Sequence, residues 1–391
     1  MKKIIFFGLL STFISVAWGQ SGKLIGQNCD LNVTINKNYS KAKTMDSIMK
    51  RYSDSAVVPG IGFAVYNEQE GWWASAQGYA DVEKKIPMNN CHLQYLQSVS
   101  KTYMAVEILQ LKEQGKIDLD APMTKYLPSK YAKYVKGGER VTVRMLLNHT
   151  SGLPDYKTTP KFVSQVVLNP TRDFTPEDEL KAIDGVNFDY EPGSKYEYKN
   201  VNYLLLSLIG DALTGDHTAW IRKNIFNKLD LKNTYYEGNT RFLDHLYLPE
   251  SYWDVVNVGR PANVTPMQKM TVACTKGDDG IVCTPVDAVK FLKGLMEGKL
   301  LKPESMKEML DFVKDEKGNK RYGLGLIYFD LGGIPAYGHG GGGLGAGCGL
   351  IYVPSKQTYF FFAVNLGVFV DGDMAQKTGK LRDAMVATML N

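Results

Sequence analysis

The 391-residue sequence is poor in cysteine and histidine, with five of each, and it contains no Cys-x-x-Cys or mixed Cys/His array. Zinc sites are usually built from such arrays, so we expect no metal, and nothing in the sequence implies another cofactor. The 46 basic and 41 acidic residues nearly balance, which argues against a nucleic-acid partner. After the N-terminus no apolar run is long enough to span a membrane.

The five cysteines are Cys29, Cys91, Cys274, Cys283 and Cys348. One disulfide is possible in an oxidising compartment, and Cys274 and Cys283 are the pair closest in sequence. An odd number leaves at least one thiol free, and spacing alone proves no pairing. Buried free thiols are therefore the default expectation.

The N-terminus has the pattern of a secretory signal. Lys2 and Lys3 precede an apolar run that ends at Trp18, and Ala17-Trp18-Gly19 is a small-x-small cleavage pattern. The run is shorter than the roughly 20 residues of a spanning helix, which disfavours the alternative of an uncleaved anchor. We expect a signal peptide at residues 1–19 and a mature chain, 20–391, that is periplasmic or secreted.

Strand-like segments lie near both ends of the sequence and helical ones lie between them. Expected strands are 61–66, 72–78, 322–329, 346–353 and 358–366, and expected helices are 41–52, 98–115, 142–147, 202–213, 285–296 and 374–390. These predict one α+β domain with an antiparallel sheet, flanked by N- and C-terminal helices. The α/β part would span about 40–97 and 305–391, with a mainly helical insertion at about 98–304.

Ser98-Val99-Ser100-Lys101 stands where an extended segment turns into a helix. A serine there can simply be an N-cap. Residues three apart on a helix share a face, however, so the Lys101 amine can reach the Ser98 hydroxyl, and the helix N-terminus can stabilise an oxyanion. A lysine of ordinary pKa, about 10.4, is no base at neutral pH, so Lys101 must be desolvated or lie near positive charge.

Two later segments offer further site residues. Tyr198-x-Asn200 precedes an apolar helical stretch, although with 23 tyrosines this pair means little alone. The segment from His339 to Gly345 is rich in glycine, which lets a ligand approach the backbone closely. A tight turn is the alternative, and the Gly-x-Gly-x-x-Gly match within it is rejected as a dinucleotide site because no helix follows.

Taken in order, Ser98-x-x-Lys101, Tyr198-x-Asn200 and His339-Gly340-Gly341 resemble the three motifs of the serine β-lactamase and D-alanyl-D-alanine peptidase superfamily. The stretches 146–153 and 280–287 are similar to signature segments of its class C branch, which also holds esterases, D-aminopeptidases and transacylases. The resemblance covers roughly residues 40–390. It implies the β-lactamase/transpeptidase-like fold.

The resemblance also implies roles. Ser98 would form the acyl-enzyme, while Lys101 and Tyr198 would share the proton transfers, and which of them accepts the first proton stays open. Asn200 would hold the lysine and the substrate. The substrate would also contact His339, Gly340, Gly341 and Gly342, with the oxyanion between the N–H groups of Ser98 and Gly342. His149 would belong to a structural turn, and Thr284, Pro285 and Asp287 would start a helix.

The third motif departs from the usual Lys-Thr-Gly, whose cation helps to bind a substrate carboxylate. His339 replaces the lysine and would be mostly neutral at pH 7, and Lys377-Thr378-Gly379 comes too late in the sequence to supply the motif. The sequence therefore favours an exported serine hydrolase acting on an ester or amide. The alternatives are an acyltransferase to a hydroxyl compound, a β-lactamase, a D-Ala-D-Ala carboxypeptidase and a non-catalytic penicillin-binding receptor.

Overall fold

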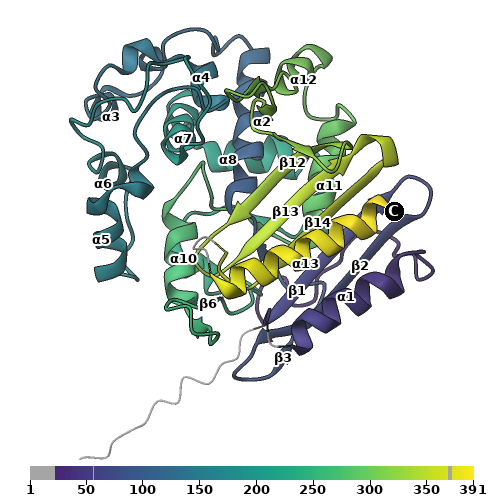
Figure 1. Ribbon diagram of the computed structural model, residues 1–391. Helices are drawn as coiled ribbons and strands as arrows, with labels where there is room; N and C mark the ends of the chain where they lie inside the picture. The colour runs from purple at the N-terminus through teal and green to yellow at the C-terminus, as the bar shows by residue number, and fades with distance from the viewer. Residues whose placement is uncertain (1–22, 56, 369–371) are drawn as a thin grey trace, which may run out of the picture.

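A computed structural model of the protein describes residues 23–55, 57–368 and 372–391. The expected signal peptide, 1–19, lies outside the described residues. The chain is built around a nine-stranded antiparallel sheet (Figure 1), in the order β3-β2-β1-β14-β13-β12-β11-β10-β9. Strands from the two ends of the sequence meet where β1 pairs with β14.

The strands of this sheet are β1 Gly60–Asn67, β2 Gly71–Asp81, β3 Ile86–Pro87, β9 Val313–Lys314, β10 Lys320–Tyr322, β11 Ile327–Asp330, β12 Pro335–Gly342, β13 Gly347–Val353 and β14 Thr358–Val364. Smaller sheets are formed by β4 Gln94–Tyr95, β8 Val282–Cys283 and β5 Thr234–Tyr235, and by β6 Tyr252–Trp253 and β7 Ala262–Asn263. The helices are α1 Ala42–Asp54, α2 Ser100–Glu113, α3 Ser129–Ala132, α4 Val143–Leu147, α5 Pro160–Leu168, α6 Pro176–Leu180, α7 Asn200–Thr214, α8 His217–Ile221, α9 Thr240–Leu243, α10 Thr265–Cys274, α11 Pro285–Met296, α12 Pro303–Met309 and α13 Asp373–Leu390.

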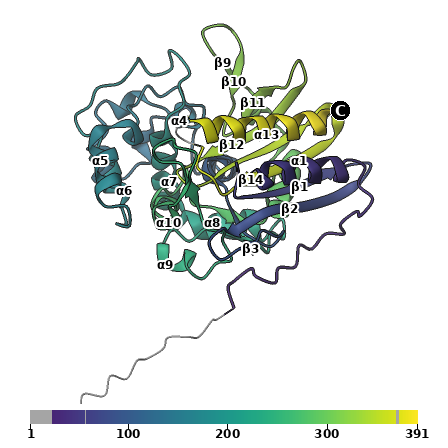
Figure 2. The same ribbon diagram turned by 60° about the horizontal axis from the view of Figure 1, so that its bottom comes forward.

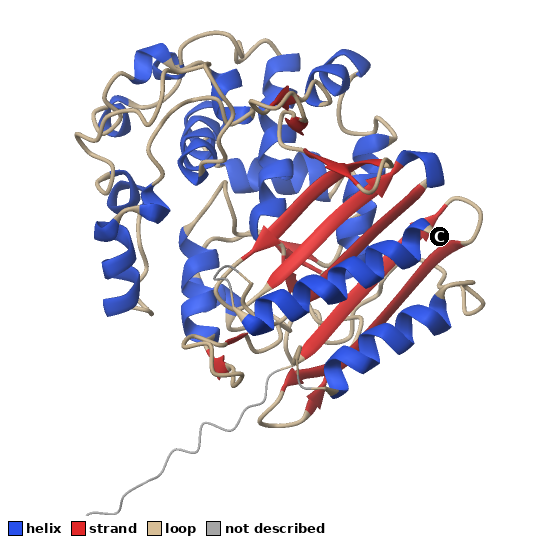
Figure 3. Cartoon of the chain, viewed as in Figure 1, coloured by secondary structure: helices blue, strands red, loops and turns tan. Residues whose placement is uncertain are grey.

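Strand β14 is apolar along its length because both of its faces are covered. Side chains alternate between the faces of a strand. Phe360 and Phe362 pack with residues of α1 and α13, whereas Phe361 packs with the helical region. Figure 2 shows α1 and α13 lying side by side on one face of the sheet, and Figure 3 shows the other helices gathered beyond it. The α+β class, the antiparallel sheet and the flanking terminal helices are thus confirmed.

The helices expected from sequence periodicity form close to their expected positions. Helix α11 begins as predicted, with the Thr284 side chain accepting the Asp287 N–H and Pro285 in the first turn. The clearest difference concerns the glycine run: residues 340–342 are not a turn but the end of strand β12, paired with 347–349 of β13. The turn lies at residues 343–346, after the motif.

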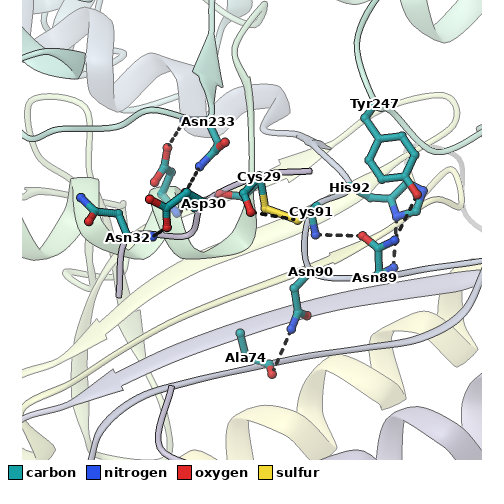
Figure 4. The surroundings of a disulfide bond; sticks show 12 residues. Cys29, Asp30, Asn32, Ala74, Asn89, Asn90, Cys91, His92, Asn233 and Tyr247 are labelled. Atoms are coloured by element: carbon teal, nitrogen blue, oxygen red, sulfur yellow. Dashed lines mark hydrogen bonds between the residues drawn. A yellow bond between two sulfur atoms is a disulfide. The ribbon is translucent and has the colours of Figure 1, made fainter. Parts of the chain in front are cut away.

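The disulfide joins Cys29 to Cys91 (Figure 4) and not Cys274 to Cys283. It ties the N-terminal segment to the loop before β4. The same segment is held by Asn233, whose side-chain amide donates to the Asp30 carbonyl at 2.8 Å. Cys274, Cys283 and Cys348 are free and buried.

Within the ranges that the structure describes, no helix is long and apolar enough to cross a membrane. Nor do those ranges contain a group of three or more His, Cys, Asp or Glu side chains that could hold a metal ion.

Candidate active site

Ser98 lies in a 3₁₀ turn, Gln97–Val99, that leads directly into α2. The preceding residue, Gln97, has φ of 50°, in the left-handed region that a non-glycine residue adopts at a cost. This sharp turn ends the extended β4 segment and starts the helix within a few residues. It sets Ser98 at the wall of a cavity of about 600 Å³.

Lys101 is completely buried beneath Ser98, one helical turn further on. Its Nζ lies 2.9 Å from Ser98 Oγ, 3.1 Å from Asn200 Oδ1 and 2.8 Å from the backbone oxygen of Asp278. Burial lowers the pKa of the amine to about 8, and the nearby Lys157 cation acts in the same direction. The desolvation expected for Lys101 is therefore present.

The Asp278 carboxylate links two lysines. Its Oδ2 lies 3.8 Å from Lys101 Nζ and 2.6 Å from Lys157 Nζ. Burial works against the charge of Lys157, but the carboxylates of Asp278, Asp279 and Asp155 together outweigh it, and the pKa of Lys157 rises to about 12. The neighbouring Asp279 is buried, and burial raises the pKa of its carboxyl group to about 7.

Tyr198 and Asn200 lie at the start of α7. The amine of Lys101 lies 5.1 Å from the centre of the Tyr198 ring, so it faces the ring. The Tyr198 hydroxyl is buried without a hydrogen bond of ordinary geometry to any described residue. Burial raises the pKa of Tyr198 well above its usual value, and the Ser98 hydroxyl opposes that rise. One Asp155 oxygen accepts both the backbone and the side-chain N–H of Asn200, at 2.7 and 2.9 Å, and so orients its amide.

His339 points from β12 toward Tyr198 and Tyr322. Its Nε2 lies 2.8 Å from the Tyr322 hydroxyl and its Nδ1 lies 2.6 Å from the Gly340 carbonyl oxygen. Burial, helped by the Lys101 charge, lowers the pKa of His339 to about 3. The ring is therefore neutral at pH 7 and supplies no cation in place of the usual lysine.

Gly341 lets β12 approach the nucleophile turn. A Cβ at Gly341 would lie 2.6 Å from the Leu96 carbonyl oxygen and 2.8 Å from Gln97 Cβ, closer than packing allows. The motif thus needs glycine here for close approach of two backbones. The end of β12, including Gly342, lies along the same cavity as Ser98.

The structure brings the predicted site residues together. The cavity is lined by Ser98, Tyr198, Asn200, His339, Gly340, Gly341 and Gly342, with Lys101 below its floor. His149 lies behind the site: its Nδ1 faces the Lys199 N–H at 3.2 Å and the Asn202 amide at 3.1 Å, and burial lowers its pKa well below the usual value. It is buried and does not line the cavity, in line with a structural position.

Sequence reasoning missed the groups that hold the motif residues in place, namely Asp155, Lys157, Asp278 and Asp279. Asp155 lies two residues after the 146–153 stretch, and Asp278 and Asp279 directly precede the 280–287 stretch. Their position next to recognised segments was the only available signal. Trp253 lines a second cavity, of about 260 Å³, between α5, α10 and the turn after β12.

The family model described as Beta-lactamase matches residues 45–381, and the chain belongs to this family. Its fold is similar to D-amino acid amidase from Ochrobactrum anthropi SV3, with a TM-score of 0.76 and 24% identity over 90% of this chain and 99% of the other. It is also similar to a penicillin-binding protein homologue from Pyrococcus abyssi, with a TM-score of 0.74 and 23% identity over 89% of this chain and 77% of that one. At these identities the likeness concerns the fold.

Among curated proteins, the chain is 26% identical to Protein flp of Staphylococcus aureus (strain MRSA252), over 51% of this chain and 39% of that protein. It is also 26% identical to the putative penicillin-binding protein PbpX of Bacillus subtilis, over 75% of this chain and 68% of that one. The match thus spans about two fifths of the length of the flp proteins. A serine hydrolase of the β-lactamase family is the class that the fold and the comparisons support.

Proposed function

We propose that the protein hydrolyses an ester or amide through an acyl-enzyme on Ser98. The observation that carries the proposal is the setting of the Lys101 amine, which is buried, 2.9 Å from Ser98 Oγ and lowered in pKa to about 8. A neutral amine has two hydrogens and one lone pair. Asn200 Oδ1 and the Asp278 carbonyl accept the two hydrogens, so the lone pair is left facing the Ser98 hydroxyl.

In the proposed reaction, Ser98 Oγ attacks the substrate carbonyl carbon and its proton passes to Lys101. The N–H groups of Ser98 and Gly342 would stabilise the oxyanion, as the family resemblance implies. The proton then reaches the leaving group, and the buried Tyr198 hydroxyl, which is free of other partners among the described residues, is the relay we assign. Water attacks the acyl-enzyme in the second half of the reaction, with the same groups returning the proton to Ser98.

Two observations support an ester or amide over a β-lactam or a D-Ala-D-Ala peptide. The neutral His339 gives no cation for the substrate carboxylate at the third motif. Proteins of similar fold include a D-amino acid amidase and a D-stereospecific amidohydrolase from Streptomyces, the latter with a TM-score of 0.73 and 23% identity over 86% of this chain and 97% of the other.

Intact-mass spectrometry after exposure to acyl esters, amides, a D-Ala-D-Ala peptide and a β-lactam tests the nucleophile. We expect the wild type to gain an acyl mass and Ser98→Ala to gain none. Ser100→Ala is the matched control, because this serine lies in the same motif but its hydroxyl accepts a hydrogen bond from the Ile281 N–H. Acylation of Ser98→Ala, or no acylation and no turnover of any compound by the wild type, would refute the proposal and favour a receptor.

Acyl transfer to an alcohol is the second candidate, favoured by the second cavity. Lys157, Asp279 and Gly342 line both this cavity and the one that contains Ser98. A bound acceptor there would lie beside the acyl-enzyme, and its mostly apolar walls would exclude water. If alcohols divert the acyl group from acid to ester at millimolar concentration, transfer is supported; if only acid forms, hydrolysis stands alone.

We also propose that the chain is exported. The N-terminal pattern of residues 1–19 and the Cys29–Cys91 disulfide support this, because disulfides persist mainly in oxidising compartments. Fractionation of expressing cells and the mass of the recovered N-terminus test it. Export predicts a chain that begins at Gln20 outside the cytoplasm, and a cytoplasmic chain that keeps Met1 would contradict it.

A further inference from the structure

Small residues face each other across a gap between the sheet and helix α13. Because His339 points toward Tyr198, alternation along β12 turns Gly340 and Gly342 to the opposite face, which α13 covers. The nearest atom to a Cβ built on Gly340 is 4.0 Å away, so the strand leaves open space there. On the facing helix, Ala375 and Gly379 are one turn apart and line the same cavity.

Gly379 has no packing reason to be glycine. It lies inside the 18-residue helix α13, where glycine destabilises a helix relative to alanine. A Cβ at Gly379 would meet nothing within 4 Å. Lys377-Thr378-Gly379, which is no part of the catalytic motifs, thus contributes Thr378 and Gly379 to the cavity wall. A side chain larger than hydrogen at residue 379 would occupy part of the cavity.

The cavity that begins at Ser98 is continuous with this gap. Its walls beside β11 and α13 are largely apolar and include the buried Phe362, Leu381 and Met385. Thr378 uses its hydroxyl to donate to the Met374 carbonyl at 2.8 Å, and Arg382 pairs with Asp383 at the surface. We name this part of the cavity the α13 channel.

We propose that the α13 channel binds the acyl group of the substrate, and that this group is an aliphatic chain. The inference rests on the proposed function and adds a substrate class to it. An acyl group stays covalently bound to Ser98 while the leaving group departs and water enters, so a largely apolar channel that is continuous with the Ser98 cavity suits the acyl group. The leaving group is then directed to the other side of β12, where the second cavity lies between α5 and α10.

The expected effect follows from the area of apolar surface that the chain buries. Burying one CH₂ group stabilises a complex enough to raise kcat/KM by about fourfold, provided that the group is buried in the transition state as well. A series of straight-chain esters therefore shows a steady rise in kcat/KM with chain length until the channel is full. A short acetyl ester gains nothing from the channel.

The test compares p-nitrophenyl esters from acetyl to decanoyl on the wild type, Gly379→Leu and Ala375→Leu. Leucine at either position fills the channel, and leucine at 379 also favours the helix, so folding is expected to survive. We expect the octanoyl-to-acetyl ratio of kcat/KM to fall at least tenfold in both variants. Lys380→Leu is the matched control: it adds the same side chain on the exposed side of α13 and leaves the ratio unchanged.

Failure of the inference is distinguishable from failure of the proposed function. Turnover of the acetyl ester that depends on Ser98, with no rise along the series, leaves the function standing and overturns the channel. A rise that both leucine variants leave intact also overturns it. A third result would also overturn the channel: the leucine variants abolish a chain-length effect for esters with a long alcohol, such as octyl acetate compared with ethyl acetate, but not for esters with a long acyl group. Circular dichroism melts verify that each variant is folded.

Discussion

Replacing Lys157 by methionine is expected to move the pH dependence of the reaction. Lys157 keeps its charge at every pH used in an enzyme assay, because the carboxylates around it, Asp278 foremost, outweigh its burial and raise its pKa to about 12. It lowers the pKa of Lys101, whose amine contacts the same Asp278 oxygen. Methionine removes this cation and leaves Asp278 to act on Lys101 alone. Both changes raise the pKa of Lys101.

The size of the shift follows from the geometry. The two amines lie 3.8 and 2.6 Å from one Asp278 oxygen, so they are close neighbours. Two unit charges about 6 Å apart repel by about 3 kcal/mol at an effective dielectric constant of about 20. That energy corresponds to about two pKa units, and relaxation of the partly exposed Lys157 side chain reduces it, so we expect a shift of about one to two units.

The assay is the pH profile of kcat/KM with an uncharged ester, which reports the free enzyme. Lys101 acts as a base only when neutral, so the rate rises as the pH passes its pKa, near 8 in the wild type. In Lys157→Met this rise moves to higher pH, whereas Lys157→Arg keeps the charge and leaves it in place. A rise that stays near pH 8 in Lys157→Met, or moves to lower pH, would refute the assignment of Lys101 as the base.

Three further outcomes are expected. Tyr198→Phe lowers kcat about 100-fold or more, while urea denaturation shows an unchanged or higher free energy of unfolding, because the buried hydroxyl makes no hydrogen bond of ordinary geometry to any described residue; a large loss of stability would contradict this. Asp155→Asn loosens the hold on Asn200 and lowers kcat/KM about tenfold. The rise of kcat/KM with pH also moves to lower pH in this variant, because the Asp155 charge favours protonated Lys101; a move to higher pH would contradict the electrostatic account. The double variant Cys29→Ser/Cys91→Ser loses a link across 62 residues and about 4 kcal/mol of unfolding free energy, and a reduced wild type that is as stable as the oxidised one would rule that out.

The sequence predicts well what depends on neighbouring residues. Helix α11 follows from Thr284 and Pro285 at its start, and strand β14 follows from a short apolar run. The Ser98–Lys101 contact also follows from helical spacing. In each case the residues that predict the feature lie within the feature or next to it in the sequence.

Features that depend on distant partners are not readable from the sequence. Glycine disfavours strands, so the sequence does not predict a strand at 340–342, yet pairing with β13 holds these residues extended. The Cys29–Cys91 bridge forms because the folded chain brings two loops together. Asp278 contributes a backbone oxygen to Lys101, and no residue type marks a carbonyl for that task. Its importance becomes visible only in three dimensions.

The pairing of β1 with β14 has a consequence for how the chain reaches its folded state. The two strands, Gly60–Asn67 and Thr358–Val364, are far apart in the sequence, so this pairing cannot form until β14 has been synthesised. Contacts of such large sequence separation slow folding, because a long loop must be ordered before they form. The central sheet therefore stays open at β1 until β14 is available to pair with it.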